Sequence, residues 1–153
     1  MKQKVCYLIL MLCMSLVSCT TTKTTVSESA DLSKYRYATM TNVSGYQNSA
    51  ELMDAEIKIF DAISNTRLQL VGDHLLNELT YEQKQQLLLV RFGVTQNGDD
   101  EESVVTVNFV DYLTGRPVVS CRGAFMFGID RRGNFNGAIK RVVSEIEKTF
   151  PKY

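Results

Sequence analysis

Apolar and polar residues alternate along this chain with two different periods, which predict strands and helices in turn. Residues 35–43 are rich in β-branched and aromatic side chains, and residues 67–71 alternate, so both segments predict strands. Between them, residues 50–64 have apolar side chains at helical spacing. A strand, a helix and a strand at this spacing form a βαβ unit, so we expect the two strands to be parallel. The expected buried stripe of the helix is Met53, Ile57, Phe60 and Ile63, with Leu52 and Ile59 beside it.

A second helical pattern leads into a strongly apolar segment. Residues 73–86 show helical spacing that is interrupted at Thr80, where Thr80 and Gln83 form the signature of a capping box. Residues 87–94 are mostly apolar, and we expect them to form the central strand of the sheet.

The last third of the chain predicts a β-hairpin and a helix. Residues 103–111 and 116–125 alternate as strands, and Gly115 is expected to take the left-handed position of their connection. The expected register places Val105, Val107 and Phe109 on one face with Val119, Cys121 and Gly123. Residues 128–136 are expected to form a glycine-rich loop and residues 137–150 a helix. The side chains that this helix is expected to bury are Ala138, Val142, Ile146 and Phe150.

These elements together predict the fold class. Their order is β-α-β-α-β-β-β-α, which gives a single α+β domain of the α/β type. We expect a mixed sheet with the helices packed mainly on one face. Asn48 and Glu51 form a further capping-box signature before the first helix.

The N-terminal residues have the organisation of a secretory signal. Lys2 and Lys4 precede the apolar run 5–14, which is shorter than the roughly 20 apolar residues that a membrane-spanning helix needs. The tetrad Leu16-Val17-Ser18-Cys19 resembles a bacterial lipobox. This resemblance implies that the chain is cut before Cys19 and that the cysteine carries acyl chains.

Cleavage at this point would leave 135 residues, which is the usual size of one domain. The segment that follows Cys19 is polar and rich in threonine and serine, which is typical of a flexible tether. We therefore expect a signal peptide at 1–18, a lipidated cysteine with its tether at 19–33 and one folded domain at 34–153.

Charge and cysteine content exclude several classes of protein. Without Lys2 and Lys4 the chain has 15 basic and 17 acidic side chains, and this near-neutral balance argues against a nucleic-acid partner. Once Cys6 and Cys13 leave with the signal and Cys19 is acylated, Cys121 has no partner for a disulfide.

No phosphate-binding or metal-binding motif is present in the sequence. The glycine pattern of a phosphate loop and metal-spaced Cys or His pairs are both missing. The acidic run Asp99 to Glu102 lacks the spacing of a calcium loop and is expected to be a charged hairpin tip. We therefore expect no cofactor and no metal.

Few side chains are candidates for a functional site. Cys121 and His74 would have to meet to act as a thiol nucleophile and a general base, but Cys121 is expected mid-strand, as a small inert hydrophobe. His74 is expected to be a capping or solvated residue. Arg131, Arg132 and Asn134 lie in the glycine-rich segment and form the candidate contact for a partner or an anion.

One segment resembles a known group of envelope proteins. The connection Asp111-Tyr112-Leu113-Thr114-Gly115 is similar to the Asp-x-x-Thr-Gly turn of the curli-secretion lipoprotein CsgG, the TolB amino-terminal domain and the LpoB-like activators. The order of elements over residues 34–150 is similar as well. This resemblance implies the α/β domain of a bacterial outer-membrane lipoprotein. Residues 95–103 form a short acidic turn where the curli pore has long amphipathic hairpins, so a pore is not expected.

The sequence leads to one main hypothesis of function and two alternatives. The main hypothesis is a non-enzymatic lipoprotein that is anchored through Cys19 to the periplasmic side of the outer membrane and binds another envelope protein. The sequence is also compatible with a homo-oligomer. The first alternative is a small periplasmic thiol enzyme or hydrolase that uses Cys121 and His74. The second is a carrier of an anionic ligand that uses Arg131 and Arg132, which requires an enclosed pocket near them.

Overall fold

A computed structural model describes residues 22–40, 50–96 and 102–152. Its strands form one six-stranded sheet in the order β1-β6-β5-β4-β2-β3. The elements are β1 (Thr22–Val26), the 3-10 helix η1 (Leu32–Lys34), β2 (Tyr37–Met40), α2 (Ala50–Ser64), β3 (Gln69–Leu70), the 3-10 helix η2 (Asp73–Leu75), α3 (Tyr81–Gln85), β4 (Leu87–Gln96), β5 (Ser103–Asp111), β6 (Pro117–Phe125) and α4 (Arg131–Thr149).

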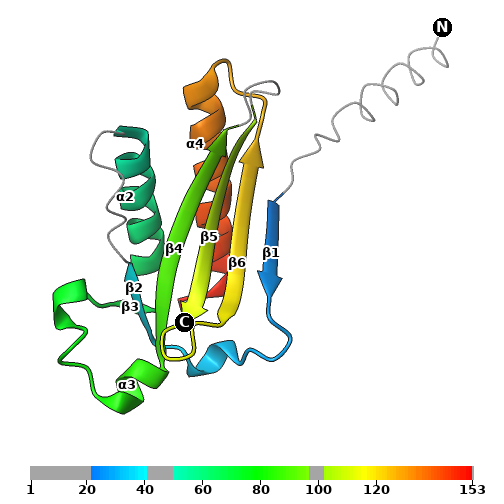
Figure 1. Ribbon diagram of the computed structural model, residues 1–153. Helices are drawn as coiled ribbons and strands as arrows, with labels where there is room; N and C mark the ends of the chain where they lie inside the picture. The colour runs from blue at the N-terminus through cyan, green and yellow to red at the C-terminus, as the bar shows by residue number, and fades with distance from the viewer. Residues whose placement is uncertain (1–21, 41–49, 97–101, 153) are drawn as a thin grey trace, which may run out of the picture.

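The two long helices cover one face of the sheet (Figure 1). α4 lies along β5 and β6, and α2 packs beside α4. Among the described residues, no helix covers the opposite face of these strands, and none is long and apolar enough to cross a membrane. The predicted fold class, one domain with a mixed sheet and helices mainly on one face, is confirmed.

The pairing of the strands agrees with the sequence patterns. β2 runs parallel to both β3 and β4, which confirms the predicted βαβ unit. β4 is an interior strand between β2 and β5. The hairpin has the expected register, since Val105, Val107 and Phe109 pair with Gly123, Cys121 and Val119. Gly115 has a positive φ of 69°, as the predicted turn requires.

The first strand corrects the expectation of a flexible tether at 19–33 for its described part, residues 22–33. Thr22–Val26 pairs antiparallel with β6 and covers an edge that would otherwise be open. Its β-branched residues favour an extended strand, and Thr24 Oγ1 donates to Glu145 of α4 over 2.7 Å. A polar strand at a sheet edge buries little apolar surface, so hydrophobicity alone did not reveal it.

α2 has the predicted bounds, but the predicted buried stripe is wrong. Met53, Ile57 and Phe60 are 55%, 57% and 49% exposed. The buried residues are instead Ala55, Ile59, Ala62 and Ile63. Two alanines let the helix backbone approach its neighbours closely, so the face that carries them turns inward. Of the stripe expected from the sequence, only Ile63 is buried.

The helical pattern at 73–86 gives two short helices in place of one. η2 and α3 are separated by a turn, and Thr80 caps α3 as predicted. The Gln83 N–H donates to Thr80 Oγ1 over 3.3 Å, and the Thr80 N–H donates to Gln83 Oε1 over 2.9 Å. The second predicted capping box begins at Asn48, which lies outside the described residues.

The last helix starts six residues earlier than expected. The Gly133 N–H donates to Asp130 Oδ1 over 2.6 Å, so Asp130 caps a helix that begins at Arg131. Gly128 before this helix and Gly133 inside it led to the prediction of a loop. Gly137, where the helix was expected to begin, lies directly against the ring of Phe125, where a methyl group would collide. All four side chains expected to be buried in the helix are buried.

Gly123 generates a testable prediction, because α4 crosses β6 directly above it. A methyl group at Gly123 would collide with the carbonyl oxygen of Ala138 and lie 2.7 Å from the nitrogen of Val142. We expect Gly123→Ala to lower the free energy of unfolding by about 2 kcal/mol or more. Gly93→Ala is the matched control, since nothing lies within 4 Å of a methyl group there. Chemical denaturation measures both, and equal effects would contradict the close packing.

Candidate functional site

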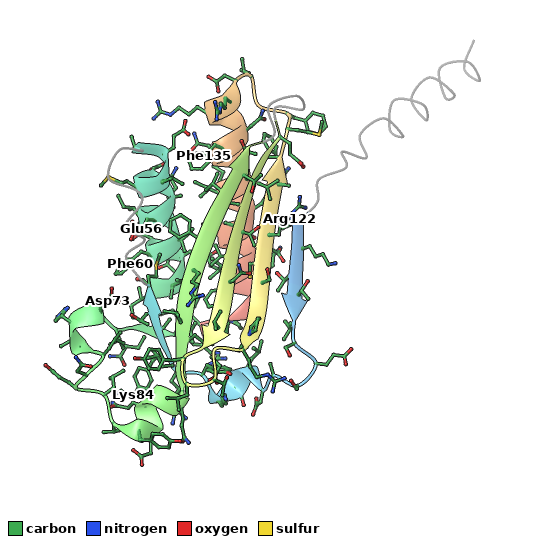
Figure 2. The ribbon with its side chains drawn as sticks, viewed as in Figure 1. Glu56, Phe60, Asp73, Lys84, Arg122 and Phe135 are labelled. Carbon is green, nitrogen blue, oxygen red and sulfur yellow. The ribbon has the colours of Figure 1, made fainter. Side chains whose placement is uncertain are left out.

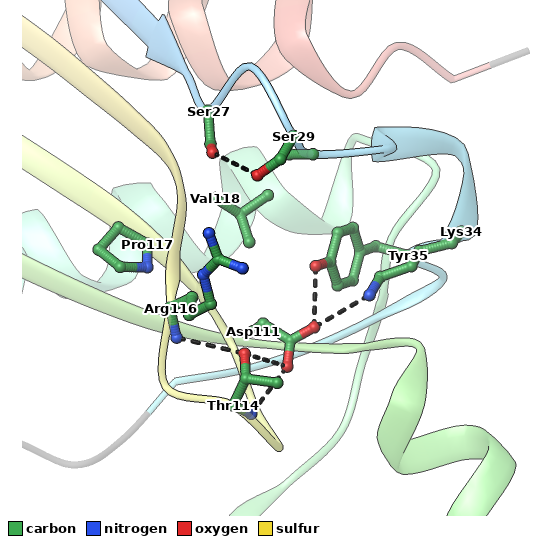
Figure 3. Close-up of a pocket in the computed structure, with 10 residues that line it drawn as sticks. Ser27, Ser29, Lys34, Tyr35, Asp111, Thr114, Arg116, Pro117 and Val118 are labelled. Carbon is green, nitrogen blue, oxygen red and sulfur yellow. Dashed lines mark hydrogen bonds and ion pairs between the residues drawn. The ribbon is translucent and has the colours of Figure 1, made fainter.

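The turn that carries the family resemblance is built around a buried carboxylate (Figure 3). Asp111 ends β5 and is 6% exposed. Its Oδ1 accepts hydrogen bonds from the backbone N–H and the hydroxyl of Thr114, each 2.9 Å long. The Gly115 N–H donates to the carbonyl oxygen of Asp111 over 2.9 Å. The spacing of aspartate, threonine and glycine is therefore explained by the turn that these residues close.

The other oxygen of Asp111 ties the hairpin to the segment before β2. Its Oδ2 accepts from the Tyr35 hydroxyl over 2.9 Å and from Lys34 Nζ over 3.1 Å. Lys34 Nζ also lies 4.6 Å from the centre of the Tyr35 ring. The carboxylate thus holds together two segments that are 76 residues apart in the sequence.

These contacts set the electrostatics of the turn. Burial on its own would raise the pKa of Asp111, but the Thr114 backbone, Lys34, Tyr35 and the Thr114 hydroxyl outweigh it and lower this pKa to about 2. Burial and the hydrogen bond to Asp111 raise the pKa of Tyr35. The carboxylate is therefore ionised at neutral pH with all of its donors in place, which suits a structural role and not that of a general base.

A small pocket adjoins this carboxylate. Its volume is about 140 Å³, which is below the 300–1,000 Å³ typical of ligand sites. The residues that line it are Ser27, Ser29, Ala30, Lys34, Tyr35, Asp111, Thr114, Arg116, Pro117 and Val118. Two of its polar groups already pair with each other, since the hydroxyls of Ser27 and Ser29 lie 3.3 Å apart.

The two arginines of the candidate contact lie at the start of α4. Arg131 and Arg132 are exposed, and Arg132 lines an open groove of about 230 Å³ together with Glu51 and Asp54 of α2. Two carboxylates beside one guanidinium do not suit an anion. This groove is therefore not the enclosed pocket that an anion carrier requires.

Asn134 has a different place from the one expected of a contact residue. It is fully buried, and its Oδ1 accepts the Gly128 N–H over 2.5 Å. The side chain thus closes the loop before α4 from the inside. This placement corrects the expectation of a surface contact.

The structure does not bring Cys121 and His74 together. Cys121 lies in β6 and is fully buried, with the hydroxyls of Thr24 and Thr149 at 3.8 and 3.9 Å from its sulfur. His74 is exposed in η2, which follows β3 at the far side of the sheet. Four strand spacings of about 4.8 Å separate β6 from β3, so about 19 Å lies between the strands. Burial also raises the pKa of Cys121, which opposes a reactive thiolate.

Two other predicted features fall largely beyond the described residues. Cys19 lies outside them, and so does the acidic run except for Glu102. Among the described residues, no three His, Cys, Asp or Glu side chains are grouped as metal ligands.

Sequence reasoning missed two exposed apolar surfaces. The first is the α2 stripe, formed by Met53, Ile57 and Phe60; Phe60 is labelled on α2 in Figure 2. The second is the 126–129 loop between β6 and α4. Its exposed side chains are Met126, Phe127 and Ile129. The signal for the first was the number of apolar residues in α2, which exceeds what one buried face can hold.

Comparisons with known proteins show similarity of fold. PelC from Paraburkholderia phytofirmans, crystallised as a dodecamer, superposes with a TM-score of 0.54 at 10% identity, over 88% of this chain and 99% of that one. A variant of PelC, also a dodecamer, gives 0.55 at the same identity and coverage. A PDZ domain protein from Parabacteroides distasonis gives 0.58 at 11% identity, over 86% of this chain and 36% of that one.

No protein-family profile matches this chain. No curated protein sequence matches it either. The resemblance to CsgG, TolB and the LpoB-like activators stays a prediction from the sequence.

The contacts of Asp111 generate a prediction about pH. The folded-state pKa of Asp111 lies below its ordinary value of 3.8, so its contribution to stability is complete above that value and is lost as the pH falls toward about 2. This depression corresponds to about 2 kcal/mol. We expect Asp111→Asn to lower the free energy of unfolding by about this much at neutral pH. We also expect the free energy of unfolding of this variant to fall less steeply than that of the wild type as the pH is lowered through the acid range.

The matched control is Asp54→Asn, which removes an exposed ion pair with Lys58. We expect it to change the free energy of unfolding by less than about 1 kcal/mol. Urea titrations between neutral pH and the acid limit measure both variants. An Asp111→Asn profile that runs parallel to the wild type through the acid range would contradict the assignment.

Proposed function

We propose that this protein is a lipid-anchored, non-enzymatic accessory protein of the bacterial envelope that works as a multimer. The anchor is the acylated Cys19, and the folded domain faces the periplasm from the outer membrane. In this role the multimer binds another component of the envelope. Three features support the proposal: the lipobox, the arrangement of the polar side chains and the exposed apolar face of α2.

The lipobox supports the anchor. Leu16 to Cys19 follow a short apolar run, at the point where a signal peptide is cut. The described domain begins at Thr22, only three residues after Cys19. An anchor so close to the domain would concentrate it at the membrane surface, where its partners lie.

The polar groups with shifted pKa values support a role other than catalysis. Asp111 is held by four hydrogen bonds from Lys34, Tyr35 and Thr114, so both oxygens of its carboxylate are already bonded within the fold. The groove of about 720 Å³ beside it is open to solvent. Cys121 lies in β6 and His74 follows β3, and three strands stand between β6 and β3 in the sheet. This placement argues against the alternative of a Cys121–His74 thiol enzyme.

The proposal of a multimer rests on the α2 stripe. Three large apolar side chains recur at positions 53, 57 and 60, so they lie on one face of the helix, and each is about half exposed. An apolar face of this kind on a domain with a complete core marks a protein contact. A protein of similar fold, PelC, crystallises as a dodecamer. We therefore place a contact between copies of this chain on the α2 stripe.

The lipid anchor is tested by metabolic labelling with a fatty-acid probe. We expect the full chain to take up the probe and to fractionate with the outer membrane, and Cys19→Ser to abolish both. The matched control is Cys121→Ser, whose hydroxyl can bond with Thr24 and Thr149 and which leaves the lipobox intact. A wild-type chain without label would contradict the anchor.

The multimer is tested by one substitution in the α2 stripe. We expect Ile57→Gln to weaken self-association roughly tenfold or more, which is about 1.4 kcal/mol per contact. Leu113→Gln makes the same change at an exposed apolar residue in the β5–β6 turn and is expected to leave association unchanged. Sedimentation velocity of the purified proteins measures both. A wild-type chain that stays monomeric at high concentration would contradict this part of the proposal.

A further inference from the structure

The 126–129 loop carries three exposed large apolar side chains within four residues. Met126 and Phe127 are 47% and 60% exposed, and Ile129 is fully exposed. Large apolar side chains that project together into water mark a surface that something covers. No part of the described chain covers them.

Hydrogen bonds and ring contacts hold the loop in one conformation, so its apolar side chains have defined positions at the surface. The Gly128 N–H bonds to the buried Asn134, and Asp130 caps α4 directly afterwards. The Phe127 ring meets the Phe125 ring edge to face, with 6.4 Å between their centres. Phe125 is in turn covered by the guanidinium of Arg141 at 4.3 Å.

The sheet register places this loop beside the start of β1. Thr22 pairs with Gly123 in an antiparallel ladder, so β1 begins at the end of the sheet where β6 ends (Figure 1). Three residues lead from Thr22 back to Cys19, and three lead from Gly123 on to Met126. Three residues span at most about 11 Å. A lipid on Cys19 therefore brings this end of the sheet to the membrane.

We propose that the 126–129 loop inserts its apolar side chains into the lipid surface that carries the anchor. This inference rests on the proposed anchoring through Cys19. Insertion would bury the three side chains at the boundary between headgroups and acyl chains, about 5–10 Å deep. Together with the anchor, it gives the domain two fixed points on the membrane and so a defined orientation.

The charges at this end of the sheet show what drives the contact. Arg131 and Arg132 follow the loop, but Arg132 lies beside Glu51 and Asp54, which disfavour a lipid phosphate there. Asp130, and Glu102 directly before the start of β5, lie at the same end of the sheet and oppose a purely electrostatic attraction. The contact is therefore apolar in origin, and we expect it on zwitterionic lipid as well as on anionic lipid.

Tryptophan fluorescence tests this insertion directly, because the natural sequence contains no tryptophan. Phe127→Trp and Ile129→Trp each place one reporter in the loop. Leu113→Trp is the matched control, since Leu113 is also exposed but lies in the turn at the opposite end of the β5–β6 hairpin. Each chain, starting at Cys19, is coupled through that thiol to a maleimide lipid in phosphatidylcholine vesicles with brominated acyl chains. Cys121 is buried and does not compete.

We expect a blue shift and the loss of roughly half of the fluorescence for both loop reporters, and neither change at position 113. Equal quenching at the three positions would overturn the proposal. A blue shift at position 127 that needs no vesicles and grows with protein concentration would also overturn it, because the loop would then contact a second copy. Chemical coupling makes this result independent of lipidation in the cell, so failure of the insertion and failure of the proposed anchor are distinguished.

Discussion

The close contact between α4 and the β5–β6 hairpin is the constraint on which the rest of the domain depends. Gly123 lets the helix backbone approach β6 so closely that no side chain fits between them. Further along, the Phe109 and Phe150 rings meet with 4.9 Å between their centres, so the contact extends over the length of the helix. α2 then packs beside α4, and its inner face is set by small residues. The position of the hairpin in turn fixes Asp111, which holds Tyr35 and the segment that leads into β2.

The sequence predicted those parts of the fold in which local pattern and tertiary packing agree. The register of the hairpin follows from strict alternation, since a slip by one residue would turn Val107 to the wrong face. α2 shows where a local pattern is insufficient, because both of its sides carry large apolar residues and only the packing of Ala55 and Ala62 decides between them. β1 is polar and lies at an edge, so no alternation of buried and exposed side chains marks it as a strand, and its pairing with β6 shows that it is one.

The candidate site was harder to predict than the fold. The Asp-x-x-Thr-Gly spacing was visible in the sequence, but its meaning depends on Tyr35 and Lys34, which lie 76 and 77 residues away. Asn134 was expected at the surface because glycines surround it in the sequence. In the structure Asp130 caps a helix that includes Asn134. The sequence shows that α2 has more apolar residues than one face can bury, but only the tertiary structure shows which of them are exposed. The α2 stripe lies on a helix and the 126–129 loop follows the last strand, so the two proposed contacts use different residues.

The antiparallel pairing of β1 with β6 has a mechanical consequence. A pull transmitted through residue 19 would act along the axis of β1, at right angles to the hydrogen bonds that join it to β6. All of these bonds would then resist together in shear, whereas a strand peeled from its end breaks them one after another. Thr24 adds a lateral hold through Glu145 of α4. The polar strand at the rim of the sheet is thus suited to bear tension applied to the chain at its N-terminal end.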